Sequence, residues 1–255
     1  MLTGGIILIG DVMIGCSTVL ESGVCIASRK PDEVPGTDIV RVGQRAHIGA
    51  GTILLSGVTI GHNAWIEPGT VVLRNIPQHA IVGGNPATIS GYRNDQSNPN
   101  NEAASSVMNR PAAPGVRASI VQGVTVHQFS RIRDLRGDLT VGEFERNIPF
   151  IPKRYFVVYD VPSSETRGEH AHLRCQQFLI CLSGTVSVVV DDGVRREEVL
   201  LDRPTVGLYI PAGIWGIQFK YSRDGTLLVF ASEYYDPEDY IRSYDEFLRF
   251  RGVDT

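Results

Sequence analysis

Two histidines spaced two residues apart are the side chains in this sequence best suited to chemistry. His170 and His172 lie in the run Arg167-Gly168-Glu169-His170-Ala171-His172. Residues two apart on a β-strand project from the same face, so both imidazoles would enter one cavity. Histidine accepts and donates protons near neutral pH, and two buried polar rings are costly unless they are paired. The run therefore predicts a proton-transfer site, with a purely structural, hydrogen-bonded pair as the alternative.

The residues around the pair disfavour a metal ion. A metal-binding cupin adds a glutamate shortly after His-x-His and another histidine after a later Pro-x-Gly turn. Gln177 occupies the first of these positions and Gly216 occupies the second. Catalytic zinc usually has three protein ligands, and a non-haem iron triad has two histidines plus a carboxylate. Since only two ligands remain, we expect no metal.

Short runs rich in β-formers surround the pair and predict antiparallel strands that close into a sandwich or barrel. These runs are residues 155–159, 178–182, 185–190, 207–210 and 227–231. In the tail, apolar side chains recur at three- and four-residue spacing from Tyr240 to Leu248. This spacing predicts a short amphipathic helix over 237–250 that begins near Asp236 or Pro237.

The first third of the chain has a different rhythm, with an apolar residue at every sixth position. This period fits neither a helix nor simple alternation, but it suits a short strand plus a turn, repeated as a β-solenoid. Glycine follows several of these residues, and we expect it to permit the turn conformation. An excursion loop over 28–36 interrupts the rhythm. The apolar residues of the six-residue rhythm are Leu2, Leu8, Ile14, Leu20, Ile26, Val42, Ile48, Leu54, Ile60, Ile66 and Val72.

The rhythm resembles that of the hexapeptide-repeat acyltransferases over residues 1–92. The most specific stretch runs from Gly57-Val58-Thr59-Ile60-Gly61 to Gly83-Gly84-Asn85-Pro86-Ala87. The resemblance implies a left-handed parallel β-helix, a trimer, and acetyl-CoA bound between subunits as a co-substrate. Because Leu2 starts the rhythm without a capping segment, we expect a truncated solenoid or one that serves chiefly in trimerisation.

Many members of that family place a catalytic histidine in the excursion loop. Here the loop begins Ser28-Arg29-Lys30-Pro31 and contains no histidine. His62 follows a predicted turn and is expected to face solvent. His47 and His79 have no recognisable partner in the sequence, which favours structural roles. The residues that bind acetyl-CoA stay unassigned.

Many ordered motifs after residue 120 are similar to those of the WxcM-like, dTDP-sugar 3,4-ketoisomerase branch of the cupins. The resemblance implies a cupin jelly roll that converts dTDP-4-keto-6-deoxy-D-glucose into its 3-keto isomer without metal or organic cofactor. The motifs are Arg136-Gly137-Asp138-Leu139, Asn147-Ile148-Pro149-Phe150, Lys153-Arg154, Tyr159-Asp160, the histidine run, Gly207-Leu208-Tyr209-Ile210-Pro211, Ala231-Ser232-Glu233-Tyr234-Tyr235-Asp236 and Asp239-Tyr240-Ile241-Arg242.

The same resemblance implies roles for individual residues. His170 would be the base, with His172 returning the proton or stabilising oxygen. Tyr159 and Arg136 would be polar groups beside the sugar, although Tyr159 also suits a core and Arg136 a solvated turn. The substrate-binding candidates are Lys153, Arg154 and Arg167 for the diphosphate, Gln177, and Trp215, which would stack on thymine or pack the barrel.

We therefore expect an all-β chain with three parts: a hexapeptide-repeat domain over 1–92, a linker rich in Asn, Ser, Ala and Pro over 93–117, and a ketoisomerase domain with a short C-terminal helix over 118–255. The main hypothesis is a bifunctional enzyme of deoxyamino-sugar biosynthesis that isomerises the sugar and acetylates the amine installed later. The alternatives are a cupin epimerase of the same substrate and a non-catalytic sugar-nucleotide-binding or assembly protein.

Composition sets the remaining limits. The chain has 255 residues and a net charge of −4, without a basic run, so nucleic acid is not expected as a partner. Apolar stretches are too short to cross a bilayer, which predicts a cytoplasmic protein without membrane contact. Its four cysteines suit reduced thiols. A homo-oligomer is expected, built from β-helix trimers, cupin dimers or both, as in a hexamer.

Overall fold

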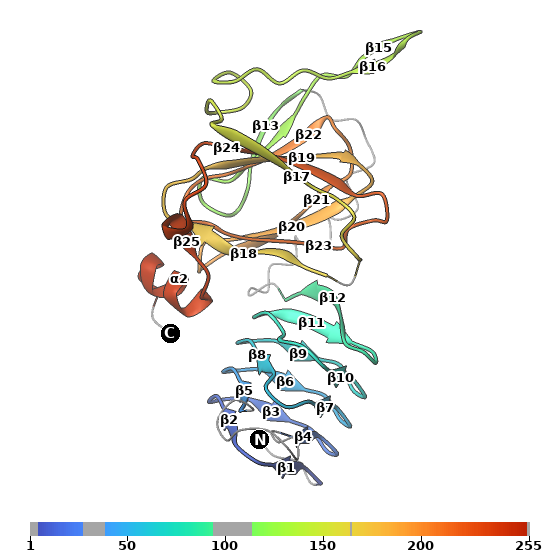
Figure 1. The fold of residues 1–255 in the computed structure, drawn as a ribbon, viewed down its shortest axis with the longest axis vertical. Helices are drawn as coiled ribbons and strands as arrows, with labels where there is room; N and C mark the ends of the chain where they lie inside the picture. Colours follow the sequence, from blue (N-terminus) through green and yellow to red (C-terminus); the bar gives the residue numbers. More distant parts are fainter. Residues whose placement is uncertain (1–4, 28–38, 94–113, 164, 254–255) are drawn as a thin grey trace. The chain divides into compact units, whose positions relative to one another are not determined.

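The computed structural model describes residues 5–27, 39–93, 114–163 and 165–253 (Figure 1). The chain divides into two compact units, Met1–Asn94 and Asp95–Thr255. The expected excursion loop and most of the expected linker lie outside the described residues. The last part of the expected linker belongs to strand β13, Gly115–Ala118.

The first unit winds through three sheets of very short strands, as a β-helix does. Its strands pair in parallel except for the last, β12, which returns antiparallel to β11. The first sheet has the order β1(Ile7–Ile9), β4(Cys25–Ala27), β7(Ile53–Leu54) and β10(Val71–Val72). The second contains β2(Val12–Ile14), β5(Val40–Val42) and β8(Thr59–Ile60). The third contains β12(Thr88–Tyr92), β11(Ala80–Gly83), β9(Trp65–Ile66), β6(His47–Ile48) and β3(Val19–Leu20).

The six-residue rhythm forms the interior of this unit, as predicted. Its members from Leu20 onward are nearly all inaccessible, and Ile48, Leu54, Ile60, Ile66 and Val72 are 0% exposed. Stacking them in successive coils buries a continuous apolar column. Leu8 and Ile14 also belong to the rhythm but are exposed, and they lie on β1 and β2, which are edge strands among the described residues.

Several glycines of the rhythm serve a purpose other than the one expected. Gly43 and Gly49 do not adopt positive φ. A Cβ on Gly43 would lie 2.6 Å from the backbone nitrogen of His62, and one on Gly49 would lie 2.6 Å from that of Pro68. These glycines therefore allow successive coils to approach closely, and the turn conformation falls instead on residues such as Gly51 and Gly69.

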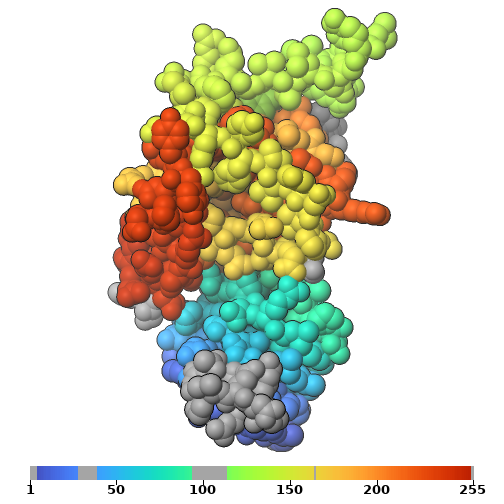
Figure 2. Space-filling model, viewed as in Figure 1, coloured from blue at the N-terminus to red at the C-terminus, as the bar shows by residue number. Residues whose placement is uncertain are grey.

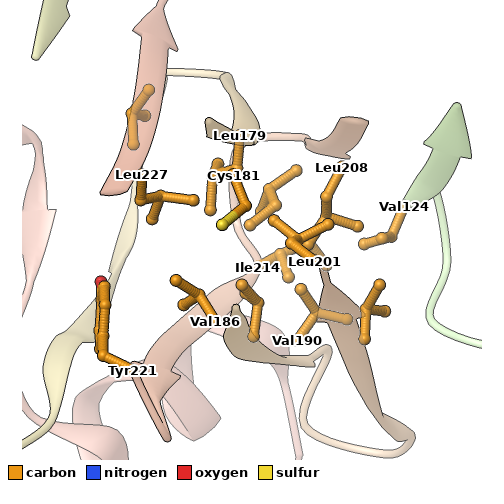
Figure 3. Close-up of a cluster of buried hydrophobic side chains, with 14 of the residues drawn as sticks. Val124, Leu179, Cys181, Val186, Val190, Leu201, Leu208, Ile214, Tyr221 and Leu227 are labelled. Atoms are coloured by element: carbon orange, nitrogen blue, oxygen red, sulfur yellow. The ribbon is translucent and has the colours of Figure 1, made fainter. Parts of the chain in front are cut away.

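The second unit is built mainly from two antiparallel sheets. One has the order β13, β14(Thr125–Gln128), β22(Val206–Ile210), β19(Gln177–Ser183), β24(Thr226–Ala231) and β17(Arg154–Val158). The other has the order β21(Arg196–Leu201), β20(Val186–Asp191), β23(Trp215–Phe219), β18(Arg167–His172) and β25(Tyr240–Ile241). Apolar side chains from both sheets, among them Leu179, Val190 and Leu208, fill the space between them (Figure 3). This closed, two-sheet core is the predicted cupin architecture.

A separate hairpin, β15(Ile132–Asp134) and β16(Gly137–Leu139), projects from this unit (Figures 1 and 2). It contains Arg136 and carries exposed apolar side chains, of which Leu135 is fully accessible.

The C-terminal segment differs from the single helix that its spacing predicted. It begins with a 3-10 turn, η1(Pro237–Asp239), continues as strand β25, and ends as helix α2(Tyr244–Arg251). The helix is interrupted because Tyr240 and Ile241 pair with His172 and Ala171 and so extend the β18 sheet. Ser243 caps the first turn of α2 and Gly252 ends it in the left-handed conformation. None of the described helices is long and apolar enough to span a membrane.

Candidate active site

The two histidines project from strand β18 into one cavity, as predicted. This cavity lies between the sheets, and its lining includes His170, His172, Gln177 and Gly216. The two imidazoles meet edge to face, with ring centroids 4.9 Å apart. Gly216 comes from the neighbouring strand β23, where it pairs with His170. The position that could have held a third histidine therefore faces the cavity without a side chain.

A buried carboxylate orients His172. Oδ2 of Asp239 lies 2.9 Å from Nδ1 of His172, and both side chains are almost inaccessible. The backbone amides of Arg174 and Cys175 also donate to this carboxylate. Since an ionised carboxylate only accepts hydrogen bonds, Nδ1 of His172 carries the proton. The lone pair is therefore on Nε2, which accepts a hydrogen bond from the Gln177 amide at 3.1 Å.

His170 is held in the same tautomer by the main chain. Its Nδ1 lies 2.9 Å from the carbonyl oxygen of Gly168, so Nδ1 donates and Nε2 keeps its lone pair. No hydrogen-bond partner holds this Nε2 among the described residues. The arrangement gives the cavity one unshared basic nitrogen beside a second imidazole backed by a carboxylate.

Burial keeps both imidazoles neutral. It lowers the pKa of His170 to about 4, aided by repulsion from Arg242 and from a protonated His172 and opposed by the hydrogen bond to Gly168. Burial also lowers the pKa of His172, and it outweighs the opposing effect of Asp239. A neutral imidazole has the lone pair that a general base needs.

This electrostatic setting predicts the pH dependence of any reaction that uses His170 as a base. Because its pKa is depressed, the basic form persists as pH falls and is lost only near pH 4. We expect kcat/KM to stay nearly constant from about pH 8 to about pH 5 and to fall below that range. A stopped assay across pH 4 to 8 measures this profile. An acid limb centred near 6.5, the value for ordinary histidine, would contradict the predicted environment.

An aromatic ring and two arginines surround the pair. Tyr240 lies against both imidazoles, at centroid distances of 4.8 Å from His170 and 4.4 Å from His172. The Arg242 guanidinium stands 4.3 Å from the centroid of Tyr240. The charges of Arg154 and Arg242 both act on His172. This edge of the site can therefore attract an anion such as a diphosphate.

The predicted binding residues fall into two groups. Gln177 lines the cavity, and Arg154 lies near it on β17, where its Nε donates to the carbonyl oxygen of Glu233 at 3.1 Å. Lys153 forms an ion pair with Glu233, in which Nζ lies 2.5 Å from Oε2. Arg167 is exposed at the start of β18. The structure thus brings Gln177 and Arg154 to the histidines but leaves Lys153 and Arg167 at the surface.

Two predicted catalytic residues do not join the pair within this chain. Arg136 lies in the turn of the projecting hairpin, where its side chain is 90% exposed and pairs with Asp134. Tyr159 follows strand β17 and is 63% exposed. Neither belongs to the described lining of the cavity. Their part in catalysis stays a prediction.

Trp215 packs the barrel and does not meet the cavity, which corrects its assignment as a substrate contact. It is 3% exposed, and its ring contacts Tyr244 and Phe247 of helix α2 at centroid distances of 5.3 and 5.5 Å. Its neighbours Ile214 and Gly216 line the cavity instead. The alternation of β23 directs Trp215 toward the helix, because Gly216 is the residue that faces His170.

This placement predicts that Trp215 contributes stability and not substrate affinity. Trp215→Ala should lower the free energy of unfolding by about 3–5 kcal/mol, because it leaves a cavity beneath α2. Trp215→Phe should keep KM for the substrate within about twofold. Urea unfolding and steady-state kinetics measure the two effects. A large rise in KM in the folded Trp215→Phe variant would indicate instead that Trp215 stacks on the thymine of the substrate.

Sequence reasoning missed three residues of the site: Asp239, Tyr240 and Arg242. Their motif was recognised as Asp239-Tyr240-Ile241-Arg242, but helical spacing placed it on an outer helix. Asp239 is 3% exposed, and nothing in its local sequence distinguishes it from the exposed acidic residues of the same segment.

One cluster near the cavity has donor atoms of a kind that hold metals. Ligand atoms of His172, Cys175 and Asp239 lie within 4.8 Å of one another. The Asp239 carboxylate is already occupied by the His172 ring and two backbone amides. The cluster is therefore satisfied as a hydrogen-bonded network.

The two-sheet barrel with inward-facing histidines defines the second unit as a cupin-type domain. The model of the WxcM-like, C-terminal family, also called FdtA, matches residues 122–252, about half of the chain. The chain therefore belongs to the WxcM-like family. The TDP-4-oxo-6-deoxy-alpha-D-glucose-3,4-oxoisomerase of Aneurinibacillus thermoaerophilus is 43% identical over 125 residues, which cover 49% of this chain and 90% of that protein.

A solved structure supports the same assignment. The sugar 3,4-ketoisomerase QdtA from Thermoanaerobacterium thermosaccharolyticum, in complex with TDP, is 38% identical and superposes with a TM-score of 0.51. The alignment covers 52% of this chain and 97% of that one.

The first unit has relatives of its own. The dTDP-3-amino-3,6-dideoxy-alpha-D-galactopyranose 3-N-acetyltransferase of A. thermoaerophilus is 46% identical over 57 residues. The match covers 22% of this chain and 29% of that protein, so the chain spans less than a third of the transferase. The match fits the predicted hexapeptide-repeat fold.

Proposed function

We propose that the second unit isomerises dTDP-4-keto-6-deoxy-D-glucose to the 3-keto sugar by proton transfer. The observation that carries this proposal is the pair of imidazoles in one cavity, with Nε2 of His170 unshared and His172 backed by Asp239. Relatives named as 3,4-ketoisomerases, which match nearly their full length, support the substrate.

The reaction relocates two hydrogens. The hydrogen on carbon 3 is acidic because it lies next to the ketone, so a base can remove it while charge develops on the oxygen at carbon 4. His170 accepts this proton through Nε2 and delivers it to carbon 4 of the enediol. The second hydrogen passes from the hydroxyl oxygen on carbon 3 to the oxygen on carbon 4. His172 carries it through Nε2, which exchanges the hydrogen bond from Gln177 for one from the substrate hydroxyl, and the Asp239 carboxylate stabilises the imidazolium that forms.

No metal is needed in this proposal. Gln177 and Gly216 occupy the positions of the missing cupin ligands, and both line the cavity. Arg154 and Arg242 supply positive charge for the diphosphate.

The position of the ketone in the product tests the function. After the protein is incubated with dTDP-4-keto-6-deoxyglucose, 13C NMR should show the carbonyl at carbon 3. A carbonyl that stays at carbon 4 while carbon 5 exchanges its hydrogen would identify an epimerase. Unchanged substrate with tight binding would identify a binding protein.

A second function is favoured by the comparison of the first unit with a sugar N-acetyltransferase. We propose that this unit acetylates the 3-amino sugar formed downstream of the isomerase, with acetyl-CoA as the donor. Calorimetry with acetyl-CoA tests this directly. Binding in the micromolar range is expected, and undetectable binding at millimolar ligand would overturn the proposal.

We also propose that copies of the chain associate through the first sheet of the β-helix unit. Its outward positions form two apolar columns, and an exposed apolar surface of this kind marks an interaction site. The first column consists of the register partners Ile7, Cys25, Ile53 and Val71. The second contains the partners Ile9 and Ala27, together with Leu55 and Leu73, which directly follow β7 and β10.

Charge placed on this face should separate the copies. Leu55→Glu should reduce the solution mass measured by light scattering from that of an oligomer, because two or more buried carboxylates would face each other. Arg45→Glu, a change outside the two columns, provides the control. An unchanged mass in the folded Leu55→Glu variant would exclude this face as the contact.

A further inference from the structure

A histidine and a glutamate form a pair on the outer face of the β-helix unit. His47 and Trp65 are register partners on strands β6 and β9, and Glu21 directly follows strand β3. Their chain neighbours Ile48 and Ile66 are fully buried in the apolar column. Because side chains alternate along a strand, His47 and Trp65 point outward. The His47 side chain is 18% exposed.

Glu21 fixes one nitrogen of this imidazole. Its Oε1 lies 3.1 Å from Nε2 of His47, and its Oε2 accepts a hydrogen bond from the backbone amide of Ala50 at 2.9 Å. The carboxylate is thus anchored to the next coil and accepts the Nε2 proton. The lone pair of neutral His47 then lies on Nδ1, which has no hydrogen-bond partner among the described residues.

Stacking fixes the plane of the ring. The imidazole lies flat against the Trp65 indole, with ring centroids 3.8 Å apart and an interplanar angle of 5°. The Arg93 guanidinium stands 5.3 Å from the centroid of the same indole. The indole and the carboxylate together hold Nδ1 in one direction on a side chain that is 18% exposed, with a positive charge close by.

The other two histidines of this unit differ from His47. Nδ1 of His62 accepts a hydrogen bond from the backbone amide of Gln44 at 2.9 Å. His79 is 6% exposed. Among the described residues of the unit, His47 alone combines a carboxylate on one ring nitrogen with an unshared second nitrogen. That combination is the one a general base requires.

We propose that His47 is the general base of acyl transfer in the β-helix unit and that Glu21 is its positioning residue. The inference rests on the acetyltransferase function proposed above and supplies the base that the histidine-free loop lacks. The amine nitrogen bonds to the thioester carbonyl carbon while Nδ1 of His47 takes a proton from that nitrogen. The carbon–sulfur bond then breaks, and the leaving thiolate takes the proton from His47.

The test is carried out on the full chain with acetyl-CoA and a dTDP-3-amino-3,6-dideoxy sugar, and thiol release is followed. His47→Gln should lower kcat by about 10²–10⁴-fold while KM for acetyl-CoA changes less than about threefold. Glu21→Gln should lower kcat by a smaller factor, because the ring remains but loses its orienting charge. His47→Gly should regain activity when imidazole is added, which a structural role would not produce.

Two controls make the result specific. His62→Gln replaces a histidine of the same unit and should keep kcat within about twofold. The isomerase activity of each variant, which belongs to the other unit, reports the amount of intact protein. Should His47→Gln lose acetyl-CoA binding, Glu21→Gln provides the same test, since it keeps every heavy-atom position.

The outcomes separate the two proposals. Wild-type transfer with a fully active His47→Gln variant would overturn the role of His47 and leave the acetyltransferase function standing. If the wild-type chain releases no thiol with any amine acceptor, the acetyltransferase proposal fails and the base assignment fails with it.

Discussion

His170→Asn should lower kcat of the isomerase by about 10³-fold or more while the protein stays folded and binds dTDP-sugar. The imidazole is replaced by a side chain of similar polarity that has no basic nitrogen. His170 has the one ring nitrogen in the cavity that is free of a partner among the described residues. General base catalysis is typically worth 10²–10⁴-fold, and both carbon proton transfers depend on this residue. Steady-state kinetics and calorimetric binding measure the two effects.

Glu169→Gln provides a matched control on the same strand. The Glu169 carboxylate accepts a hydrogen bond from the Thr166 hydroxyl and does not belong to the described lining of the cavity. The kcat of the Glu169→Gln variant should stay within about threefold of wild type. A His170→Asn variant that retains full activity would show that another group removes the carbon 3 hydrogen.

Asp239→Asn should lower kcat by about 10²–10⁴-fold with little change in KM. The substitution keeps the shape of the side chain but removes the charge that stabilises a His172 imidazolium. It also places an amide where a carboxylate accepts from Nδ1 of His172 at 2.9 Å, which disturbs the tautomer. An equivalent loss behind the histidine of serine proteases costs about 10⁴-fold in kcat.

The test of Asp239 as a positioning residue needs a readout beyond activity. NMR of the imidazole nitrogens should show the His172 tautomer altered in Asp239→Asn, with His170 unchanged. Asp236→Asn is the matched control, because Asp236 lies in the same segment, is partly exposed and pairs with Arg174. Equal losses in both variants would indicate a general disturbance of the segment, and an unaltered His172 tautomer would contradict the assigned role.

Local patterns predicted much of this molecule. The six-residue rhythm identified the column from Leu20 to Val72, because each coil repeats the same contacts. The two-residue spacing of His170 and His172 placed both rings in one cavity, because strand geometry alone determines that result. Gln177 was found from its spacing after the pair.

Residues whose position depends on contacts distant in the sequence were not predicted. Asp239 and Tyr240 contact His172 because β25 pairs with β18. Asp239 and His172 are 67 residues apart in the sequence. The three- and four-residue spacing of apolar side chains in the tail predicted a helix at the position of this strand. Glu21 likewise reaches His47 only after one full coil, so His47 lacked a visible partner. Trp215 could not be assigned because the side of β23 that faces α2 depends on the register with β18.

The reaction in D2O tests the central claim most directly. The carbon 3 proton is held on Nε2 of His170 before it is delivered to carbon 4, so the fraction that exchanges with D2O on this nitrogen appears as deuterium at carbon 4. With wild-type protein and dTDP-4-keto-6-deoxyglucose, NMR should show a ketone at carbon 3 and deuterium at carbon 4, and His170→Asn should abolish both signals. A ketone retained at carbon 4, with deuterium confined to carbon 5, would contradict the isomerase account.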